Sequence, residues 1–313
     1  MSKLSKIANK AADGMLIDAF TDNIMKKTRY KDEKLQPLYN TMISQKHRML
    51  YYKKLKKKLF NKCIANRYWE NLEKKVNKDR IWVCWLDGME KAPDIVKSCY
   101  RSLENHIPAK NITVITKSNF SEFVELPEDI IKKWQAGIIG PAHFSDILRT
   151  EILIKYGGYW IDSTVYCTDS SILHYIDKQP LFMYSFYYFG FNPEIMEANN
   201  WFIYSTTNNN ILCLMRELLY AYWRTYDRAV NYFFYHILLS MAIDYYREEY
   251  DKMPIVSQVD SHILATYIFD DFDKDKLQIL CKSTGFHKLS TRFDLKKKKG
   301  NDTFYDMIIT NRL

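Results

Sequence analysis

The order of apolar and polar positions changes at about Arg80, and the two parts predict different kinds of structure. Residues 1–80 contain one proline and one glycine and are rich in lysine, leucine, methionine, asparagine and tyrosine. Their periodicity predicts two to four helices. The segment 44–62 surrounds an apolar stripe with lysines, and four residues form this stripe at helical spacing: Met49, Tyr52, Leu55 and Leu59.

Short apolar runs alternate with amphipathic segments in the rest of the chain. Residues 81–86 are wholly apolar and precede an Asp-Gly pair, which is typical of a buried strand that opens into a loop. A helix is predicted over 94–106 and a β-branched strand over 111–116. This order predicts an α/β domain in which helices cover a mixed or parallel sheet.

The stretch 141–167 carries the most informative pattern. A helix is predicted up to Tyr156, where two glycines end it, and Ser145 is expected to cap its start. Asp146 and Arg149 lie three residues apart near this start, so they share one face of the helix.

An acidic residue interrupts the apolar run that follows the two glycines. Residues 159–165 are predicted to form a strand in which Asp162 and Thr164 point to the same side. Burial of an unpaired carboxylate is costly, and a bound divalent cation would compensate that cost. Alternatively, Asp146 and Arg149 form a local ion pair, and Asp162 accepts backbone hydrogen bonds at a strand end.

The net charge of +9 is distributed unevenly. Residues 1–80 carry 21 basic and 8 acidic side chains, a net charge of +13, whereas residues 81–313 carry 25 and 29, a net charge of −4. A basic amphipathic helix over 44–62 is suited to an anionic membrane surface, to nucleic acid, or to packing of its apolar side against the body of the protein.

Other features bear on the compartment. The six cysteines are scattered without a C-x-x-C pair, so neither a zinc cage nor a redox motif is indicated. The N-terminus lacks the apolar core of a signal peptide, and the most apolar stretch, 232–246, is shorter than the roughly 20 residues of a spanning helix. We therefore expect a cytoplasmic protein, with peripheral attachment to the inner face of the cell membrane as one arrangement.

Two motifs in the central stretch resemble the signature of the capsular polysaccharide synthesis proteins. They are F-S-D-I-L-R at 144–149 and K-Y-G-G-Y-W-I-D-S-T at 155–164. Three further motifs agree in order and spacing: I-W-V-C-W-L-D-G at 81–88, Asn200-Trp201-Phe202 and His287-Lys288-Leu289. The resemblance covers about residues 81–291. That group is similar to the DxD-containing sugar transferases related to the yeast mannosyltransferases and, more distantly, to the glucosylating clostridial toxins.

The resemblance implies a GT-A fold, in which helices flank a mixed sheet that binds a nucleotide sugar. This domain would span residues 81–313, and residues 1–80 would form a basic helical extension. By position, the resemblance implies that Trp85 stacks on or flanks the nucleobase. It also implies that Asp146 binds hydroxyl groups of the ribose or donor sugar, and that Arg149 contacts the donor sugar or its phosphate.

A metal site is implied at the end of the strand. Asp162 matches the aspartate of the metal motif, whereas Thr164 stands where the general motif has a second aspartate. Thr164 would bind the metal more weakly through its hydroxyl group, or would act on it through a water molecule. Mn²⁺ or Mg²⁺ would stabilise the charge of a leaving diphosphate. His287 and Lys288 are expected to close over the diphosphate, His287 as a metal or phosphate ligand and Lys288 as a point charge, unless they are a solvated surface pair.

Aromatic residues are dense over 180–250 and suit either a core or platforms for sugar rings. We expect Trp201 and the segment 184–191 to line a cleft, and His236 to be a core histidine. Two further residues are candidates for contact with an acceptor: Asp260 and His262.

The sequence therefore predicts a glycosyltransferase that moves a sugar from a nucleoside diphosphate sugar, with a UDP-sugar as the expected donor. The expected acceptor is an oligosaccharide, lipid-linked in capsule or exopolysaccharide assembly, near an anionic membrane surface contacted through residues 44–62. The resemblance implies retention of configuration without a protein nucleophile.

Two other functions remain open at this point. One is a catalytically silent scaffold of the same fold, in keeping with Thr164. The other is a nucleic-acid-binding protein that uses residues 44–80, against which stand the acidic body and the lack of a nucleic-acid-binding motif.

Overall fold

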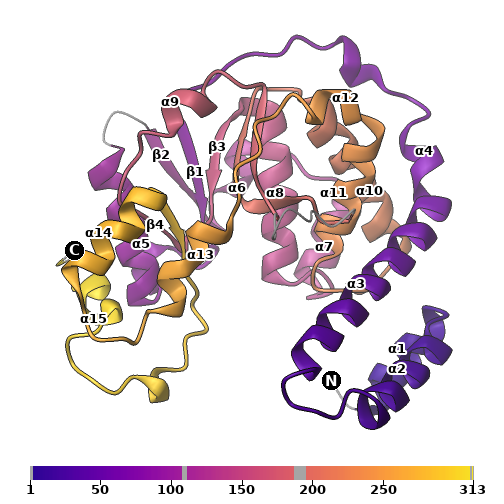
Figure 1. Cartoon of the computed structure of the whole chain (residues 1–313). Helices are drawn as coiled ribbons and strands as arrows, with labels where there is room; N and C mark the ends of the chain where they lie inside the picture. The colour runs from indigo at the N-terminus through magenta and orange to yellow at the C-terminus, as the bar shows by residue number, and fades with distance from the viewer. Residues whose placement is uncertain (1–2, 108–110, 187–194, 311, 313) are drawn as a thin grey trace.

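The computed structural model describes residues 3–107, 111–186, 195–310 and 312, and it is built around a mixed sheet (Figure 1). The five strands lie in the order β2-β1-β3-β6-β5. Their bounds are β1 (Arg80–Cys84), β2 (Asn111–Ile115), β3 (Gly158–Ile161), β5 (Leu181–Ser185) and β6 (Ala198–Ser205). β1 runs parallel to both β2 and β3, whereas β6 runs antiparallel to β3 and β5.

The apolar runs of the sequence form the central strands. β1 and β2 begin and end within two residues of the predicted strands over 81–86 and 111–116. Ile81, Trp82 and Val83 are buried, as expected of a strand covered on both faces. The run is therefore apolar at successive positions because both faces of the strand are buried.

Helices cover both sides of the sheet. α8 (Pro141–Tyr156), α10 (Asn210–Thr225) and α11 (Phe234–Tyr245) pack together to the right of the sheet in Figure 1. α5 (Asp94–His106) lies on the other side and has the predicted bounds. α8 starts earlier than predicted, with Pro141 in its first turn, so Ser145 lies inside the helix and does not cap it.

Two glycines make the turn from α8 into β3. Gly157 and Gly158 have φ angles of +65° and +91°, which L-residues with side chains adopt rarely. A Cβ atom at Gly158 would lie 2.6 Å from the carbonyl oxygen of Arg80, and one at Gly157 would lie 2.9 Å from that of Ser205. Both positions therefore require glycine, for conformation and for the close approach of neighbouring strands.

The C-terminal segments form a second hydrophobic cluster beside α5. A two-stranded antiparallel sheet joins β4 (Val165–Cys167) to β7 (Phe286–Lys288). Three helices complete this part: α13 (Val259–Thr266), α14 (Lys274–Ser283) and α15 (Phe304–Ile309). The fully buried members of the cluster include Val96, Cys99, Leu264 and Phe304. This packing brings the end of β7 back to the main sheet.

The N-terminal region is helical, as predicted, but its second half belongs to the main core. α1 (Lys3–Ala12) and α2 (Leu16–Thr28) lie beside α3 (Gln36–Leu55), which continues as a π-helical turn over Lys56–Phe60 and as α4 (Asn61–Cys63). Several of these residues are buried in the same cluster as the sheet: Tyr51, Leu55, Leu59, Phe60 and Trp69. The boundary predicted at Arg80 therefore does not separate two packing units.

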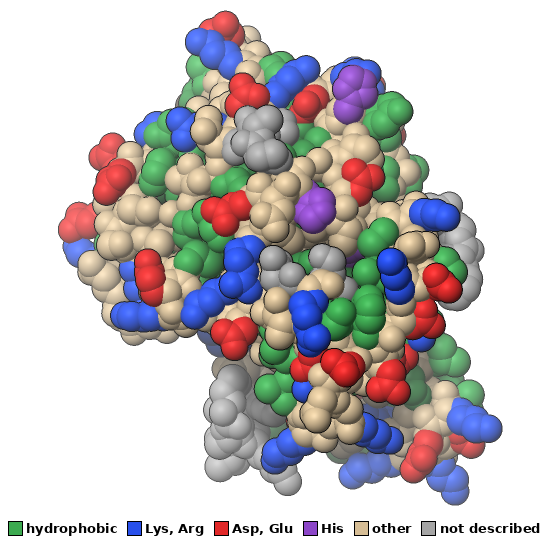
Figure 2. Space-filling view, turned by 90° about the vertical axis from the view of Figure 1, so that its left-hand side faces the viewer, with side chains coloured by type: hydrophobic (Ala, Val, Ile, Leu, Met, Phe, Trp, Pro, Cys, Tyr) green, Lys and Arg blue, Asp and Glu red, His purple; other side chains and the backbone are tan. Residues whose placement is uncertain are grey.

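The remaining helical segments are short: α6 (Phe120–Phe123), α7 (Glu128–Gln135), α9 (Leu173–Ile176), α12 (Arg247–Tyr250) and 3₁₀ turns at Tyr68–Asn71, Met89–Lys91 and Leu295–Lys297. The predicted fold class, a mixed sheet flanked by helices with further helices at the N-terminus, is confirmed. None of the helices in the described part of the chain has the length and apolarity to span a membrane. Figure 2 shows the face on the left of Figure 1, where acidic and basic side chains are interspersed.

Candidate active site

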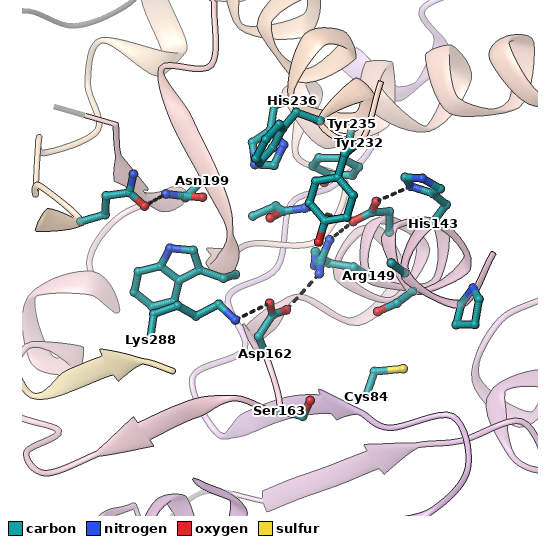
Figure 3. A pocket seen from close by; sticks show the side chains of 18 of the residues that line it. Cys84, His143, Arg149, Asp162, Ser163, Asn199, Tyr232, Tyr235, His236 and Lys288 are labelled. Carbon is teal, nitrogen blue, oxygen red and sulfur yellow. Dashed lines mark hydrogen bonds and ion pairs between the residues drawn. The ribbon is translucent and has the colours of Figure 1, made fainter. Parts of the chain in front are cut away.

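A cavity of about 860 Å³ lies at the carboxyl ends of β1 and β3 (Figure 3). Because these neighbouring strands run parallel, the residues that follow them meet at one edge of the sheet, where α/β proteins bind ligands. Side chains from α8, β6, α11, α13 and β7 complete the wall. The lining divides into a charged half around Asp162 and an aromatic half around His236.

Arg149 is the centre of the charged half. Its side chain is 5% exposed and bonds two carboxylates, one from its own helix and one from the end of β3. One Nη atom donates to Asp146, and the other donates to Asp162 Oδ1 at 3.0 Å. The guanidinium group also lies 4.9 Å from the centre of the Trp160 ring. The predicted pairing of Asp146 with Arg149 is thus present, and it extends to Asp162.

Asp162 lies in a turn after β3. The predicted strand over 159–165 ends at Ile161, because the Val165 amide donates to the carbonyl oxygen of Asp162. The Asp162 carboxylate accepts from Trp160 Nε1 at 3.1 Å and lies 3.4 Å from Lys288 Nζ. Burial opposes ionisation of Asp162, but the positive charges of Lys288 and Arg149 outweigh it and lower the pKa of the carboxyl group.

Lys288 reaches the charged half from the end of β7. Its ammonium group bridges Asp162 and the hydroxyl group of Thr164, to which it donates. The Leu289 amide donates to the carbonyl oxygen of Thr164 at 2.8 Å, which holds the two segments together. Lys288 is 19% exposed in its side chain and lines the cavity, so the alternative of a solvated surface lysine is wrong.

His287 does not reach the cavity, which corrects its predicted contact with metal or phosphate. Successive side chains of a strand point to opposite faces, so the neighbour of Lys288 turns away from it. His287 is fully buried, and its Nε2 atom lies 3.0 Å from the Thr168 hydroxyl oxygen. Burial lowers the pKa of this imidazole to about 4.

The residues predicted as metal ligands do not fit a metal ion held by side chains alone. Both carboxylate oxygens of Asp162 are paired with cations, and the Thr164 hydroxyl group accepts a hydrogen bond from one of them. Within the described residues, no three His, Cys, Asp or Glu side chains form a group that could hold a metal ion. Positive charge in this half of the cavity comes from Arg149 and Lys288.

Two polar neighbours of Asp146 were not predicted as site residues. Asn200 Nδ2 donates to Asp146 Oδ1 at 3.0 Å, and His143 Nδ1 lies 3.5 Å from Asp146 Oδ2. Both residues line the cavity. The sequence could have indicated both residues. Asn200 belongs to the Asn200-Trp201-Phe202 motif, and His143 lies one helical turn before Asp146 and therefore shares its helix face.

Trp85 lies at the rim of the charged half, directly after β1. It lines the cavity, and its buried Nε1 atom has no hydrogen-bond partner among the described residues. Cys84 lines the cavity beside it, but burial raises the pKa of its thiol to about 12. Cys84 is therefore protonated at neutral pH and is not suited to act as a nucleophile.

The aromatic half has buried polar atoms without protein partners. The Trp201 ring stacks on Tyr184 with ring centres 4.6 Å apart, and the Trp201 Nε1 atom has no partner within the described part of the chain. His236 is 6% exposed, lines the cavity, and has no partner there for either ring nitrogen. His236 is buried, as expected of a core histidine, but it also lies on the cavity wall, and burial lowers the pKa of its imidazole to about 4.

The other residues expected near an acceptor differ in their placement. His262 lines the cavity and bonds the carbonyl oxygen of Gln258 through Nδ1 at 2.9 Å, whereas Asp260 is exposed and is not part of the cavity wall. Trp201 and Phe186 line the cavity, as expected. Residues 187–191 of the predicted cleft segment lie outside the described residues.

A comparison with protein-family profiles agrees with the motifs. The family profile described as capsular polysaccharide synthesis protein matches residues 31–308. No curated protein sequence matches the chain significantly. The solved structure of PaToxG glycosyltransferase is similar with a TM-score of 0.41 and 16% sequence identity, over 85% of this chain and 98% of that chain. The family match begins before Arg80, in keeping with the shared core.

Proposed function

The chain belongs to the capsular polysaccharide synthesis protein family, and from this premise we propose that it is a glycosyltransferase that uses a nucleoside diphosphate sugar. The observation that carries the proposal is a buried network of two carboxylates and two cations at the edge of the parallel strands. Carboxylates accept hydrogen bonds from sugar hydroxyl groups, and cations bind phosphate. Both kinds of group line one cavity.

Lys288 is the cation that meets the diphosphate. Its side chain is more exposed than that of Arg149, at 19% against 5%, and among the described residues it pairs with one carboxylate, that of Asp162. Arg149 is a positioning residue, because its two Nη atoms hold Asp146 and Asp162 apart in fixed orientations. The two carboxylates then accept hydrogen bonds from hydroxyl groups of the ribose and the donor sugar. Trp85, at the rim, offers its ring to the nucleobase.

In the proposed reaction, the bond between the anomeric carbon and the diphosphate oxygen breaks, and its electron pair leaves with the diphosphate. The acceptor hydroxyl oxygen forms the new bond to the same carbon, and its proton passes to the leaving diphosphate. This route needs no protein nucleophile and retains configuration. Lys288 stabilises the negative charge that grows on the diphosphate, which is the largest electrostatic demand of the reaction.

The aromatic half of the cavity suits an oligosaccharide acceptor. Aromatic rings bind the apolar faces of sugars, and Phe186, Trp201 and Phe233 all line this half. His236 is neutral at physiological pH because burial lowers its pKa, so each of its ring nitrogens is available for a hydroxyl group. We assign His236 to orienting the acceptor.

A ligand panel tests the proposal. Thermal unfolding of the full chain would be followed with UDP-, GDP- and CDP-sugars, with Mn²⁺ alone, and with short DNA and RNA oligonucleotides. We expect at least one nucleotide sugar to raise the midpoint by several degrees, and neither Mn²⁺ alone nor the oligonucleotides to do so. Stabilisation by oligonucleotides only would favour the nucleic-acid-binding alternative.

A substitution then separates an enzyme from a silent scaffold. Asp162→Asn keeps the shape of the side chain but removes its charge, and we expect transfer or donor hydrolysis to fall about a hundredfold or more while the protein stays folded. The matched control is Asp302→Asn, at a carboxylate that is 82% exposed and remote from the cavity. Nucleotide-sugar binding without any transfer by the unmodified chain would indicate a scaffold, and equal activity of Asp162→Asn would contradict the role of Asp162.

A further inference from the structure

The N-terminal helices leave an unusual amount of apolar surface uncovered. The described residues include eighteen large hydrophobic side chains that are exposed, and eight of these fall within residues 7–42. The eight are Ile7, Leu16, Ile17, Phe20, Ile24, Leu35, Leu38 and Met42. The other ten are spread over 68–295. Single exposed hydrophobic residues need no explanation, but a concentration of this kind marks an interaction surface.

The exposed residues follow helical spacing. Ile17, Phe20 and Ile24 lie on one side of α2, and Leu38 and Met42 lie on one side of the first turns of α3. Figure 1 shows α1, α2 and the start of α3 projecting at the lower right, away from the sheet. We call these eight side chains the N-terminal apolar face.

Polar contacts fix the opposite side of the same helices. Asp13 is 6% exposed and lies between Arg228, 2.6 Å away, and the Tyr51 hydroxyl group, 2.9 Å away. Asp22 pairs with Lys46 at 3.1 Å and with His47 at 2.9 Å. The hairpin of α1 and α2 is therefore held to α3 and to the body by its polar side. On the apolar side, the described residues leave these large side chains exposed.

The net charge of the N-terminal helices indicates the chemistry of the surface that they would contact. Residues 1–62 carry 16 basic and 5 acidic side chains, a net charge of +11. Three of the five acids, Asp13, Asp18 and Asp22, already pair with basic side chains of the chain. An apolar helix face beside excess lysine suits the headgroup region of an anionic bilayer, which attracts the positive charges.

The segment that the sequence predicts to contact a membrane is not the one whose apolar residues the structure leaves exposed. The apolar stripe of 44–62, predicted to contact the membrane, packs on the body: Leu55 and Leu59 are buried, and Met49 packs against the core. That stripe is not free to enter a bilayer. The lysines at 53, 57, 58 and 62 are exposed, but they lie at or beyond the C-terminal end of α3, away from the exposed residues of its first turns.

We propose that the N-terminal apolar face docks the protein on an anionic lipid bilayer. α3 connects this face to the cavity, because Arg48 lies 4.7 Å above the ring of Phe233, which lines the aromatic half. Arg48 follows Met42 by six positions on α3, so the helix holds this face at a fixed distance from the cavity. The consequence for a lipid-linked acceptor rests on the proposed function, whereas the docking itself does not.

Vesicle flotation of the full chain tests the docking. We expect the protein to float with vesicles that contain phosphatidylglycerol and to bind phosphatidylcholine vesicles at least tenfold more weakly. The double variant Ile17→Ser/Phe20→Ser should lose tenfold or more of its affinity for the anionic vesicles, because it removes two inserted side chains. The matched control is Ile255→Ser/Ile279→Ser, at positions 70% and 65% exposed elsewhere, and it should bind like the unmodified chain.

Three results would overturn the proposal. The unmodified chain could fail to bind the anionic vesicles, the Ile17→Ser/Phe20→Ser variant could bind them equally well, or this variant could abolish a dimer that forms without lipid. The last outcome would make the face an interface between copies of the chain. Thermal shifts with nucleotide sugars should be the same for this variant and the unmodified chain, so failure of docking and failure of the proposed function are distinguishable.

Discussion

The two halves of the cavity are both buried, but their principal polar side chains differ in pairing. In the charged half, the charged side chains pair with one another, although Arg149 Nε and Trp85 Nε1 there have no partner within the described residues. In the aromatic half, both ring nitrogens of His236 and the Trp201 Nε1 atom have no partner within the described residues. Unpaired buried polar atoms are costly, so those on a cavity wall are expected to pair with water or with a ligand.

This difference indicates how the two halves contribute. The charged half is preorganised, because its own ion pairs fix its side chains without a ligand. Under the proposed function, the charged half would meet the donor, and hydroxyl groups of the acceptor would pair with the polar atoms of the aromatic half. Loss of a residue in the charged half should therefore cost both stability and activity, whereas loss of His236 should leave the fold intact.

The largest effect is expected at Arg149. Arg149→Leu leaves Asp146 and Asp162 buried without their shared cation, so the free energy of unfolding should fall by about 3–5 kcal/mol. Chemical denaturation measures this change. Arg224→Leu is the control, because Arg224 pairs with Asp129 at the surface, with both side chains about half exposed, and its loss should cost less than about 1 kcal/mol. Equal losses in the two variants would mean that the charged half is not preorganised.

A smaller effect is expected at Lys288. Lys288→Met should weaken the binding of a nucleoside diphosphate about 10- to 100-fold, since a hydrogen bond to a charged group contributes about 1.5–3 kcal/mol. Titration calorimetry measures the affinity, and Lys288→Arg should restore part of it. Lys282→Met, at an exposed position on α14, is the control. Unchanged affinity in Lys288→Met would exclude Lys288 from contact with the diphosphate.

The smallest effect concerns His236 and depends on pH. Burial lowers its pKa from 6.5 to about 4, so below pH 6.5 the unfolded chain binds a proton that the folded chain does not. The folded state is therefore destabilised as the pH falls from about 6.5 to about 4, by up to about 1.4 kcal/mol per pH unit. His236→Phe removes this contribution.

Chemical denaturation at two pH values measures the contribution of His236 to the pH dependence of stability. Between pH 7 and pH 5, the variant should lose about 1–2 kcal/mol less stability than the unmodified chain. The matched control is His174→Phe, at an exposed histidine that does not line the cavity. The same loss of stability in His236→Phe and the unmodified chain would show that His236 titrates normally, and would remove the contrast between the two halves.

Local patterns predicted the charged half well. Asp146 and Arg149 share a helix face because of their spacing, and the two glycines end α8 because both adopt positive φ. Asp162 follows an apolar run and lies at the end of a buried strand. These features depend on residues close in sequence, so periodicity and turn chemistry suffice to predict them.

Contacts between distant segments were predicted less well. His287 and Lys288 are adjacent in sequence, and only the pairing of β7 with β4 decides which of them faces the cavity. Strand register shifted by one residue would exchange them. The position of His236 on the cavity wall and the burial of Leu55 and Leu59 in the main core depend in the same way on helix packing.

The sequence by itself thus determined the family, the class of fold, and the residues that meet at the ends of β1 and β3, because each depends on a short motif. Only the tertiary structure decided that Lys288 forms an ion pair with Asp162 and that the N-terminal apolar face is exposed. It also decided that the ring nitrogens of His236 have no partner among the described residues. Burial and pairing depend on everything that packs around a side chain, and a linear pattern does not specify those neighbours.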